Sequence, residues 1–596
     1  MLSLDPTQSV AMTADPHSIA SSWLAAFASA VDAADIAALA ELFTPDGWLR
    51  DLLVSTWDNR SLEGREKIHG FLSSTLAAAE LTNIKLDDTD YLAPRTSFIA
   101  QLQSPDVESA FTFECAHGHG QGYVRLLPDG TGDHRAFTVM LMLSDLHGHE
   151  ESETLILRED LTGVPGRNMQ EEFADWVTQV ESKPYVLVVG GAQTGLQLAA
   201  RFKQMNIPAL VIERNARPGD VWRKRYPSLT LHTPRRHHSL LYQSYPTNWP
   251  EYTGRDKLAG WLDQYAVSQD IVLWTNSTLK PNPKYDPDTR EWDVTVIRSG
   301  AEVKLRPAHI VLATGTLGAA NIPDIHGQDI FRGSVLHSTV YDGPKPHVGK
   351  RVVVIGAGNS SIDICQDLIL YGAESVTMVQ RSSTCVIGRD FISALLRQNW
   401  PEDVPMVVSD LRWASIPNGL QKKMSIASQD FMWESQRELH DKLRKGGVKL
   451  NMGPEGEGLF IMTLGRLGGF WQDKGGADLI ADGRIKIKGG VSPDHFTETS
   501  VVFSDGSELP ADVVIYATGY VQIKETNRAL FGEEMMENTK PVYGLDEEGE
   551  LRGSYRPSGH PGLWFATGDF FNSRFMSKIL ALQLKAIQLG LMEATS

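Results

Sequence analysis

The stretch from Val186 to Glu213 constrains the fold of this chain more than any other part of its sequence. The apolar run at 185–189 has the form of a strand that is buried on both faces of a parallel sheet. A glycine turn at 190–195 follows, then a segment of helical composition and a second apolar run at 209–212. This order predicts a dinucleotide-binding unit, in which a helix N-terminus faces a pyrophosphate and the Glu213 carboxylate meets ribose hydroxyls.

One position of this glycine motif departs from the usual pattern. The second glycine normally lets the backbone approach the pyrophosphate, and Ala192 stands there instead. A methyl group is tolerated at that position if the backbone φ angle is negative. An ordinary buried βα unit, without any nucleotide, is the alternative interpretation of the stretch.

A second unit of the same kind begins near Arg351. The apolar run at 352–355 leads into the turn at 356–361, which reads G-x-G-x-x-S, and a helical segment follows. The next strand ends in Gln380 and Arg381, without a carboxylate. An arginine at that position suits a 2′-phosphate, whose charge an acidic residue would repel. The two units therefore predict two nucleotide sites of opposite charge preference.

Composition and charge narrow the class of protein. The 596 residues exceed the usual size of one hydrophobic core, so two to four domains are expected. A net charge of −18 argues against nucleic acid or an anionic membrane as a partner. The three cysteines form no C-x-x-C pair, which excludes a disulfide framework and disfavours a dithiol redox centre. With no secretory signal and no apolar run of about 18 residues, a cytoplasmic location is expected.

The first 150 residues have a pattern of their own. Helices are expected at 19–32, 36–43 and 65–78, and alternating strands follow, with Phe111, Phe113 and Cys115 on one face. The segment at 151–184 is charged and irregular, apart from a helix near 169–180, and is expected to be a linker.

Two sets of polar residues in this part allow more than one interpretation. Asp51, Asp58 and Arg60 are either polar groups of a pocket or a set of surface salt bridges. The pairs His117/His119 and His147/His149 resemble metal-binding pairs, but no cysteine or carboxylate stands at ligand spacing beside them. We therefore expect no metal site.

Several segments carry a resemblance to a known family. Gly219-Asp220-Val221-Trp222 is followed by Arg225-Tyr226-Pro227, and residues 331–341 read F-x-G-x-x-x-H-x-x-x-Y, ending in Tyr341. Ala-Thr-Gly strands occur at 313–315 and 517–519. Together with both glycine turns, these motifs resemble the flavin-containing monooxygenase family, and the segments at 468–473 and 480–485 resemble its YUCCA branch and the fungal and bacterial relatives of that branch. The resemblance covers roughly residues 183–590.

The resemblance implies an α/β flavoprotein with two dinucleotide-binding, Rossmann-type domains, one for FAD and one for NADPH. The N-terminal helices and curved sheet resemble the SnoaL-like α+β cone, which serves as a small-molecule pocket or as a dimer interface, so a homodimer is one expected assembly. The implied divisions are a SnoaL-like domain at 17–150, a linker at 151–182, the first part of the FAD domain at 183–345, the NADPH domain with a helical insertion at 346–505, and the last part of the FAD domain at 506–596.

The resemblance also implies a reaction. NADPH reduces the flavin, O₂ adds to give a 4a-hydroperoxyflavin, and one oxygen atom passes to a small organic substrate. No protein nucleophile is needed, since the cofactor carries the chemistry. The residues expected at FAD are Gly190, Ala192, Gln193, Gly195, Glu213, Trp222, Arg225 and Asp569. Those expected at NADPH are Gly356, Gly358, Asn359, Ser361 and Arg381.

The sequence leaves the type of oxygenation open. Many family members carry an asparagine two residues before a proline beside the flavin, and this chain has His232 before Pro234. His232 is therefore the one catalytic candidate, as a hydrogen-bond donor to the peroxide or a ribose. Oxidative decarboxylation of a 2-oxo acid and N- or S-oxygenation both remain. A Baeyer–Villiger enzyme is the alternative that Tyr341 argues against, because those relatives carry tryptophan there. An NADPH-dependent flavin reductase or oxidase, with the N-terminal domain as a binding or dimerisation module, is a further alternative.

Overall fold

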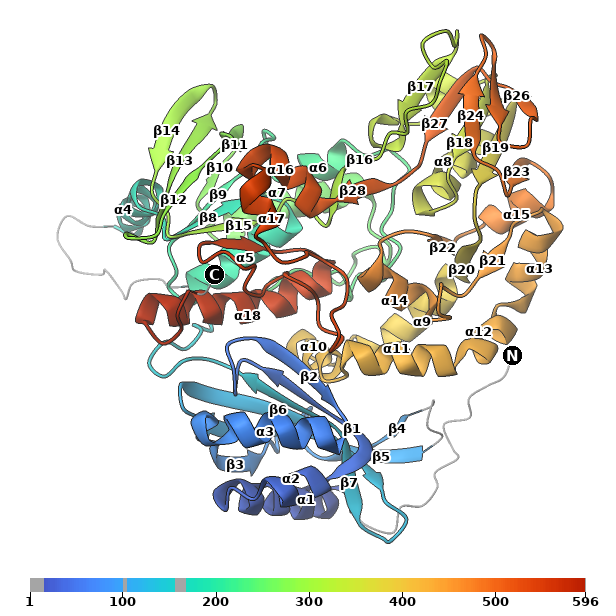
Figure 1. Ribbon diagram of the computed structural model, residues 1–596. Helices are drawn as coiled ribbons and strands as arrows, with labels where there is room; N and C mark the ends of the chain where they lie inside the picture. The colour runs from blue at the N-terminus through green and yellow to red at the C-terminus, as the bar shows by residue number, and fades with distance from the viewer. Residues whose placement is uncertain (1–14, 100–103, 156–167, 595–596) are drawn as a thin grey trace.

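The computed structural model describes residues 15–99, 104–155 and 168–594. Three bodies are visible in Figure 1: an N-terminal domain in blue, and two α/β bodies that lie side by side above it. The long helix α18 (Phe570–Leu589) lies between the N-terminal domain and the rest of the chain, as do helices α10 (Met406–Ala414) and α11 (Asn418–Ala427).

The N-terminal domain packs three helices against a curved mixed sheet. The strand order of this sheet is β2-β1-β7-β6-β5-β3, and β4 pairs with β5. Strand β1 runs parallel to β7, and the other pairs are antiparallel. Trp23, Phe27, Phe111 and Tyr123 are buried in the core. The elements are α1 (Pro16–Asp32), α2 (Ile36–Glu41), β1 (Phe43–Leu52), β2 (Asn59–Glu63), α3 (Arg65–Ala79), β3 (Thr82–Leu86), β4 (Arg95–Ile99), β5 (Ser104–Cys115), β6 (Gly118–Pro128) and β7 (His134–Leu143).

The sequence-based expectation differs from this domain in two details. The second helix ends at Glu41, because Phe43 is already paired with Ala136 at the start of β1. The resemblance to the SnoaL-like cone implied an antiparallel sheet, but β1 and β7, which are far apart in sequence, form a parallel pair. Helix α4 (Met169–Ser182) confirms the helix predicted in the linker, and Asn168 and Glu171 form a capping box at its N-terminus. Part of the predicted linker, 156–167, lies outside the described residues.

The first α/β body contains a five-stranded parallel sheet in the order β10-β9-β8-β15-β29. Helices α5 and α18 pack beside each other against it, and a β-meander extends from one edge (Figure 1). Its elements are β8 (Val186–Val189), α5 (Gln193–Gln204), β9 (Ala209–Ile212), α6 (Asp220–Arg223), α7 (Arg255–Ser268), β10 (Leu273–Trp274), β11 (Ser277–Leu279), β12 (Lys284–Asp286), β13 (Glu291–Arg298), β14 (Ala301–Leu305), β15 (His309–Leu312) and β29 (Leu563–Phe565).

The second α/β body contains another five-stranded parallel sheet, in the order β17-β27-β18-β19-β23. Its elements are β17 (Ser334–His337), β18 (Arg351–Ile355), α8 (Asn359–Leu370), β19 (Ser375–Gln380), β23 (Ile485–Gly489) and β27 (Val513–Tyr516), with the small sheet β24 (Pro493–Phe496), β25 (Ser500–Phe503) and β26 (Glu508–Pro510) at one end. Strands β17 and β27 belong to this sheet, although they lie outside the range 346–505 predicted for the NADPH domain. The first strand of this sheet along the chain, β17, begins at Ser334, and the last, β27, ends at Tyr516. Strand β27 pairs with both β17 and β18, so it lies between them.

The predicted helical insertion is confirmed as a group of helices around a three-stranded sheet. Its elements are β20 (Thr384–Gly388), α9 (Arg389–Asn399), α10 (Met406–Ala414), α11 (Asn418–Ala427), α12 (Gln429–Ser435), α13 (Arg437–Lys445), β21 (Leu450–Asn451), α14 (Gly458–Gly465), β22 (Phe470–Asp473) and α15 (Gly476–Ala481). The connections between the two α/β bodies are formed by β16 (Leu317–Ala320), β28 (Tyr520–Gln522), α16 (Ile523–Phe531), α17 (Glu533–Glu537) and the short 3₁₀ turns Ser338–Val340 and Lys345–His347.

Candidate active site

The first glycine turn has the close backbone contacts that a nucleotide turn requires. Gly190 has φ +109°, and a Cβ there would lie 2.4 Å from the carbonyl oxygen of Ala313. A Cβ on Gly195 would lie 1.8 Å from the carbonyl oxygen of Gly190, so only glycine lets α5 start this close to β8. Ala192 has φ −88° and precedes the first residue of α5, so its methyl group fits without strain.

Glu213 stands at the end of β9, facing this turn. Its Oε2 accepts a hydrogen bond from the backbone N–H of Gly191 at 2.8 Å, and its Oε1 accepts from the backbone and side chain of Asn215 at 2.8 and 2.7 Å. The side chain is buried. The carboxylate is therefore held beside the turn by several donors, which is the position that a ribose-binding carboxylate requires.

Trp222 and Arg225 belong to the segment that follows Glu213. The Trp222 indole donates to Oε1 of Gln193 at 3.3 Å and stacks on Phe570, with ring centroids 6.4 Å apart. The Nε of Arg225 is buried and has no hydrogen-bond partner among the described residues. A buried, unpaired guanidinium N–H is costly without an acceptor. Together with the glycine turn, this unpaired donor fits an anionic nucleotide cofactor.

Asp569 begins helix α18 at the other side of the first sheet. Its Oδ1 accepts from the backbone N–H of Asn572 at 2.9 Å, and its Oδ2 lies 3.6 Å from Nε2 of His237. Gly568 donates its N–H to Oγ1 of Thr316 at 2.7 Å. The N-terminus of α18 thus lies at the carboxyl end of β15, and half of the Asp569 side chain remains exposed.

The second glycine turn repeats this construction. Gly356 has φ +125°, and a Cβ there would lie 2.2 Å from the carbonyl oxygen of Ala517. A Cβ on Gly358 would meet nothing closer than 3.7 Å. Ser361 Oγ accepts from the N–H of Gly358 at 3.3 Å, and Asn359 Oδ1 accepts from the N–H of Gln472 at 3.0 Å. The turn is therefore tight on the sheet side and open on the opposite side.

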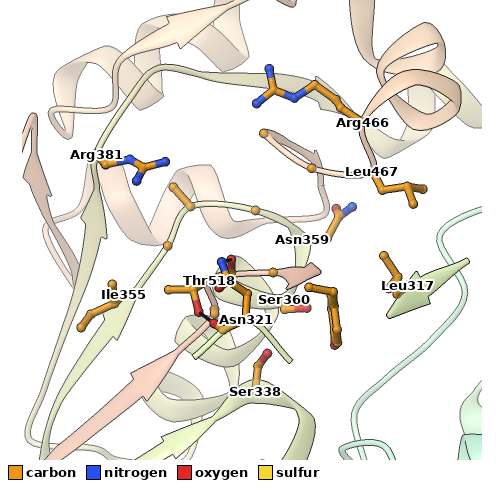
Figure 2. A pocket seen from close by; sticks show the side chains of 18 of the residues that line it. Leu317, Asn321, Ser338, Ile355, Asn359, Ser360, Arg381, Arg466, Leu467 and Thr518 are labelled. Atoms are coloured by element: carbon orange, nitrogen blue, oxygen red, sulfur yellow. Dashed lines mark hydrogen bonds between the residues drawn. The ribbon is translucent and has the colours of Figure 1, made fainter. Parts of the chain in front are cut away.

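A cavity of about 830 Å³ lies over the open side of this turn. Figure 2 shows Arg381 and Arg466 on two sides of it, with both guanidinium groups extending toward the space between them. Both side chains are exposed, and neither forms an ion pair with another described residue. The cavity continues to Arg225 and Thr316 of the first α/β body. It therefore joins the carboxyl ends of the two parallel sheets, where α/β folds bind their ligands.

The structure separates the predicted site residues into three groups. Gly356, Gly358, Asn359, Arg381 and Arg225 line the cavity, whereas Ser361 lies beneath the second turn. The remaining residues predicted for FAD surround the first turn and the start of α18. Arg466 was missed, since its loop at 465–469 reaches the cavity only through the packing of α14, and no local motif marks it.

His232 is outside the set of residues that line the cavity. Its Nε2 lies 3.6 Å from Oδ2 of Asp363 on α8, and that carboxylate also accepts from the Tyr226 hydroxyl at 2.6 Å and pairs with Lys474 at 3.0 Å. Burial alone would raise the pKa of Asp363, but these partners hold it at about 2. His232 is thus part of a charged cluster that joins the two α/β bodies, and its catalytic role remains a prediction.

The motif at 331–341 also joins the two bodies. His337 Nε2 lies 3.2 Å from the carbonyl oxygen of Gly519, in the second Ala-Thr-Gly strand, and its Nδ1 lies 3.0 Å from Thr339 Oγ1. Burial lowers the pKa of His337, although the bond to Gly519 opposes this. Tyr341 is buried beside Tyr226, with ring centroids 6.1 Å apart. These contacts support the expected linking role of the motif.

Two of the three polar candidates in the N-terminal domain, Asp58 and Arg60, form ion pairs with residues near the C-terminal part of the flavin domain. Asp58 forms an ion pair with Arg556 at 2.6 Å, and Arg60 forms one with Glu548 at 2.6 Å. Both residues therefore form salt bridges between domains, which favours the salt-bridge interpretation. Asp51 is fully buried and accepts backbone hydrogen bonds from Val54 and Ser55.

Carboxylates lie beside the histidines at 119 and 147, so the expectation that no carboxylate stands near them is wrong. Glu114 lies opposite His119 in the β5–β6 pairing, and Asp145 Oδ1 lies 2.5 Å from Nδ1 of the same histidine. Nε2 of His147 also lies 3.9 Å from Oε2 of Glu114. Carboxylates therefore do stand beside the histidines.

Comparison with known proteins gives a consistent assignment. The model of the family described as flavin-binding monooxygenase-like matches residues 224–525, about half of the chain. Indole-3-pyruvate monooxygenase YUCCA1 of Oryza sativa subsp. japonica is 28% identical over 354 residues, which cover 59% of this chain and 79% of that protein. The probable indole-3-pyruvate monooxygenase YUCCA7 of Arabidopsis thaliana is 31% identical over 342 residues, which cover 56% and 73%.

A solved structure shares the fold. A cyclohexanone monooxygenase variant from Rhodococcus sp. Phi1, bound to NADP⁺, superposes with a TM-score of 0.50 at 16% identity, covering 69% of this chain and 87% of that one. Among the helices of the described residues, none combines the length and the apolar character needed to cross a membrane. The match to the family model, the two glycine turns and the cavity between two parallel sheets agree with one another. The chain belongs to the flavin-binding monooxygenase-like family, and it is an FAD- and NADPH-dependent monooxygenase that acts on a small molecule and O₂.

Proposed function

We propose that this monooxygenase acts on a small 2-oxo acid of the indole-3-pyruvate type, by oxidative decarboxylation. The observation that carries the proposal is the cavity that joins the two glycine-turn bodies, because it brings a cationic group, Arg225, to the junction between them. The curated relatives named above are indole-3-pyruvate monooxygenases, which supports the same substrate class. Arg225 offers a charge-assisted hydrogen bond to a carboxylate or a phosphate at this junction.

NADPH is proposed to bind in the cavity, with its pyrophosphate at the N-terminus of α8. Gly356, Gly358, Asn359 and Ser361 form the turn that would hold it, since exposed N–H groups at a helix N-terminus attract phosphate. Arg381 and Arg466 are proposed to hold the 2′-phosphate between them. Two guanidinium groups without acidic partners make a site that favours an added phosphate over a free hydroxyl.

FAD is proposed to bind at the first glycine turn. Gly190, Ala192, Gln193 and Gly195 would face its pyrophosphate, and Glu213 its ribose. Trp222, Arg225 and Asp569 complete the proposed set. When bound, FAD supplies the oxygen-activating chemistry and NADPH supplies the hydride, while the protein orients both and excludes water.

The proposed substrate class is tested by a screen with the FAD-loaded enzyme. NADPH consumption and product formation are measured with a 2-oxo acid, a tertiary amine, a thioether and a cyclic ketone. Release of CO₂ with conversion of the 2-oxo acid to the acid one carbon shorter supports the proposal. Oxygenation of the amine or thioether alone, or conversion of the ketone to an ester, contradicts it and assigns N- or S-oxygenation or Baeyer–Villiger activity instead.

The N-terminal domain is proposed to be a SnoaL-like cone that supports the flavin domain. Its helices followed by a curved sheet have the expected order of elements, and Asp58 and Arg60 are engaged in contacts with residues 546–556. The use of the cone as a dimer interface predicts a homodimer, and light scattering of the full chain tests it. A cytoplasmic location is also proposed, and fractionation of the native host tests the location.

A further inference from the structure

We infer that the N-terminal domain carries a site for a divalent transition metal, formed by Glu114, His119 and His147. The site lies at the end of the sheet where the chain turns from β7 toward the linker. One atom of each side chain lies within 4.8 Å of the other two. None of these residues belongs to the flavin or NADPH sites proposed above.

The ligand atoms are directed toward one another. Oε2 of Glu114 lies 3.8 Å from Nε2 of His119 and 3.9 Å from Nε2 of His147. A tetrahedral zinc with bonds of about 2.0–2.1 Å places its ligand atoms roughly 3.3 Å apart. The two distances from Glu114 therefore need to shorten by only about half an ångström, and rotation of the partly exposed side chains allows this.

A fourth residue orients one of the ligands. Nδ1 of His119 lies 2.5 Å from Oδ1 of Asp145, which leaves Nε2 of the same ring directed at Glu114. A carboxylate on the far nitrogen of a ligand histidine fixes the tautomer that binds metal and increases the basicity of the ring. The His119 ring is thus held between two carboxylates, Glu114 and Asp145. A simple surface ion pair needs only one of them.

The backbone holds the ligands on rigid elements. Glu114 and His119 are cross-strand partners in the β5–β6 hairpin. His147 lies in the turn after β7, where its N–H donates to the carbonyl oxygen of His117 at 3.1 Å, and Leu146 bridges to His149. Ligands fixed by strand register lose little conformational entropy when a metal binds.

The chemistry of the set selects the metal. Two imidazole nitrogens and one carboxylate oxygen suit Zn²⁺ and its neighbours in the transition series, whereas Ca²⁺ and Mg²⁺ prefer oxygen ligands alone. The side chains of Glu114, His119 and His147 are 35%, 43% and 50% exposed, so a fourth position faces solvent. Three protein ligands with one open position is the arrangement of an accessible zinc site.

The test uses full-length, FAD-loaded protein from which any affinity tag has been removed. After treatment with a chelator and dialysis, Zn²⁺ binding is measured by competition with a chromophoric chelator and by metal analysis after equilibrium dialysis. Wild type is expected to bind one Zn²⁺ per chain. His147→Ala and the nearly isosteric Glu114→Gln are expected to weaken binding at least tenfold, and Asp145→Asn about ten- to a hundredfold.

His149→Ala is the matched control, since His149 lies in the same turn but outside the ligand set. It is expected to keep wild-type affinity. Circular dichroism and the thermal unfolding of each variant, compared with wild type, report whether its N-terminal domain is folded. FAD content and NADPH oxidation are not expected to change. Wild type that binds less than one Zn²⁺, or Glu114→Gln and His149→Ala proteins that bind equally, would overturn the inference. If His147→Ala does not fold, Glu114→Gln and Asp145→Asn decide the result.

Discussion

Arg50 of the N-terminal domain forms a bidentate ion pair with Glu550, 500 residues later in the chain. Its Nε and Nη2 lie 2.7 and 2.8 Å from the two carboxylate oxygens, and both side chains are almost fully buried. Arg50 also donates to the carbonyl oxygen of Ala414, and Ser61 donates to Glu550 at 2.7 Å. A buried pair whose remaining groups are also hydrogen-bonded is costly to break on one side.

Arg50→Ala is therefore expected to lower the free energy of unfolding by about 3–5 kcal/mol, because it leaves the Glu550 carboxylate buried without its cation. Thermal unfolding of the FAD-loaded protein measures the change. Lys280→Ala is the control, since it breaks an exposed pair with Glu302, which water and salt screen, and should change the stability little. Equal losses for the two variants would contradict the assignment of Arg50 as a buried anchor.

Removal of the N-terminal domain is expected to leave a fragment, 183–596, that binds FAD and oxidises NADPH. Both glycine turns and the cavity lie within it. The fragment should melt at a lower temperature than the full chain, because Glu548, Glu550 and Arg556 lose their partners. Glu550→Gln should destabilise the full chain and leave the fragment unchanged. A folded fragment that lacks flavin would show instead that the N-terminal domain completes the flavin site.

Arg381→Ala is expected to raise the KM for NADPH about ten- to a hundredfold, since a charge-assisted hydrogen bond contributes roughly 1.5–3 kcal/mol. Arg466→Ala should act in the same direction. The KM for NADH and the bound FAD should stay nearly unchanged, because NADH has no 2′-phosphate. Lys350→Ala, which removes an exposed cation outside the cavity, serves as the control. Steady-state flavin reduction with both coenzymes decides the matter, and a parallel loss with NADPH and NADH would refute the role.

The buried carboxyl group of Asp51 should make the free energy of unfolding depend on pH. Burial raises the pKa of Asp51 to about 7, despite the hydrogen bonds that it accepts from Ser55 and Val54. The folded state therefore holds this proton more tightly than the unfolded state, in which the pKa is near 4. The contribution of Asp51 is favourable below pH 4 and is lost as the pH rises toward 7. Relative to wild type, Asp51→Asn should gain melting temperature between pH 5 and pH 8, and a difference that stays constant with pH would argue against it.

Gly195→Ala is expected to abolish FAD binding, because the new methyl group would lie 1.8 Å from the carbonyl oxygen of Gly190 and force α5 away from β8. Gly260→Ala in α7 is the matched control. Nothing lies within 4 Å of its added Cβ, so this helical glycine should be replaced with a gain of up to about 1 kcal/mol. Flavin absorbance of the purified proteins gives the comparison. Retention of FAD by Gly195→Ala would show that the turn is looser than these contacts indicate.

The sequence was sufficient for features that depend on local backbone chemistry. The glycine turns at Gly190 and Gly356 need positive φ angles, and short apolar runs on both sides reveal the strands that they connect. The position of Arg381 follows directly from the end of its strand. Each of these features is contained within about 30 residues, so no knowledge of tertiary packing is needed to place it.

Features that depend on the meeting of distant segments could not be placed in this way. Strands β17 and β27 join one sheet from positions that sequence order assigns to different domains. Arg466 reaches the cavity through a loop whose path is set by packing. Glu114 and His119 are an intermediate case, because their pairing follows from the register of one hairpin and was within reach of a cross-strand argument.

Strand β29 has a consequence for the order in which the protein can form during synthesis. The first parallel sheet lacks its edge strand until residues 563–565 have been made, and α18, which packs on α5, comes later still. Arg50 is translated 500 residues before its partner Glu550. A nascent chain therefore carries an open edge on β15 until residues 563–565 have been added, and termination between residues 313 and 562 yields a protein with an unpaired β15 edge.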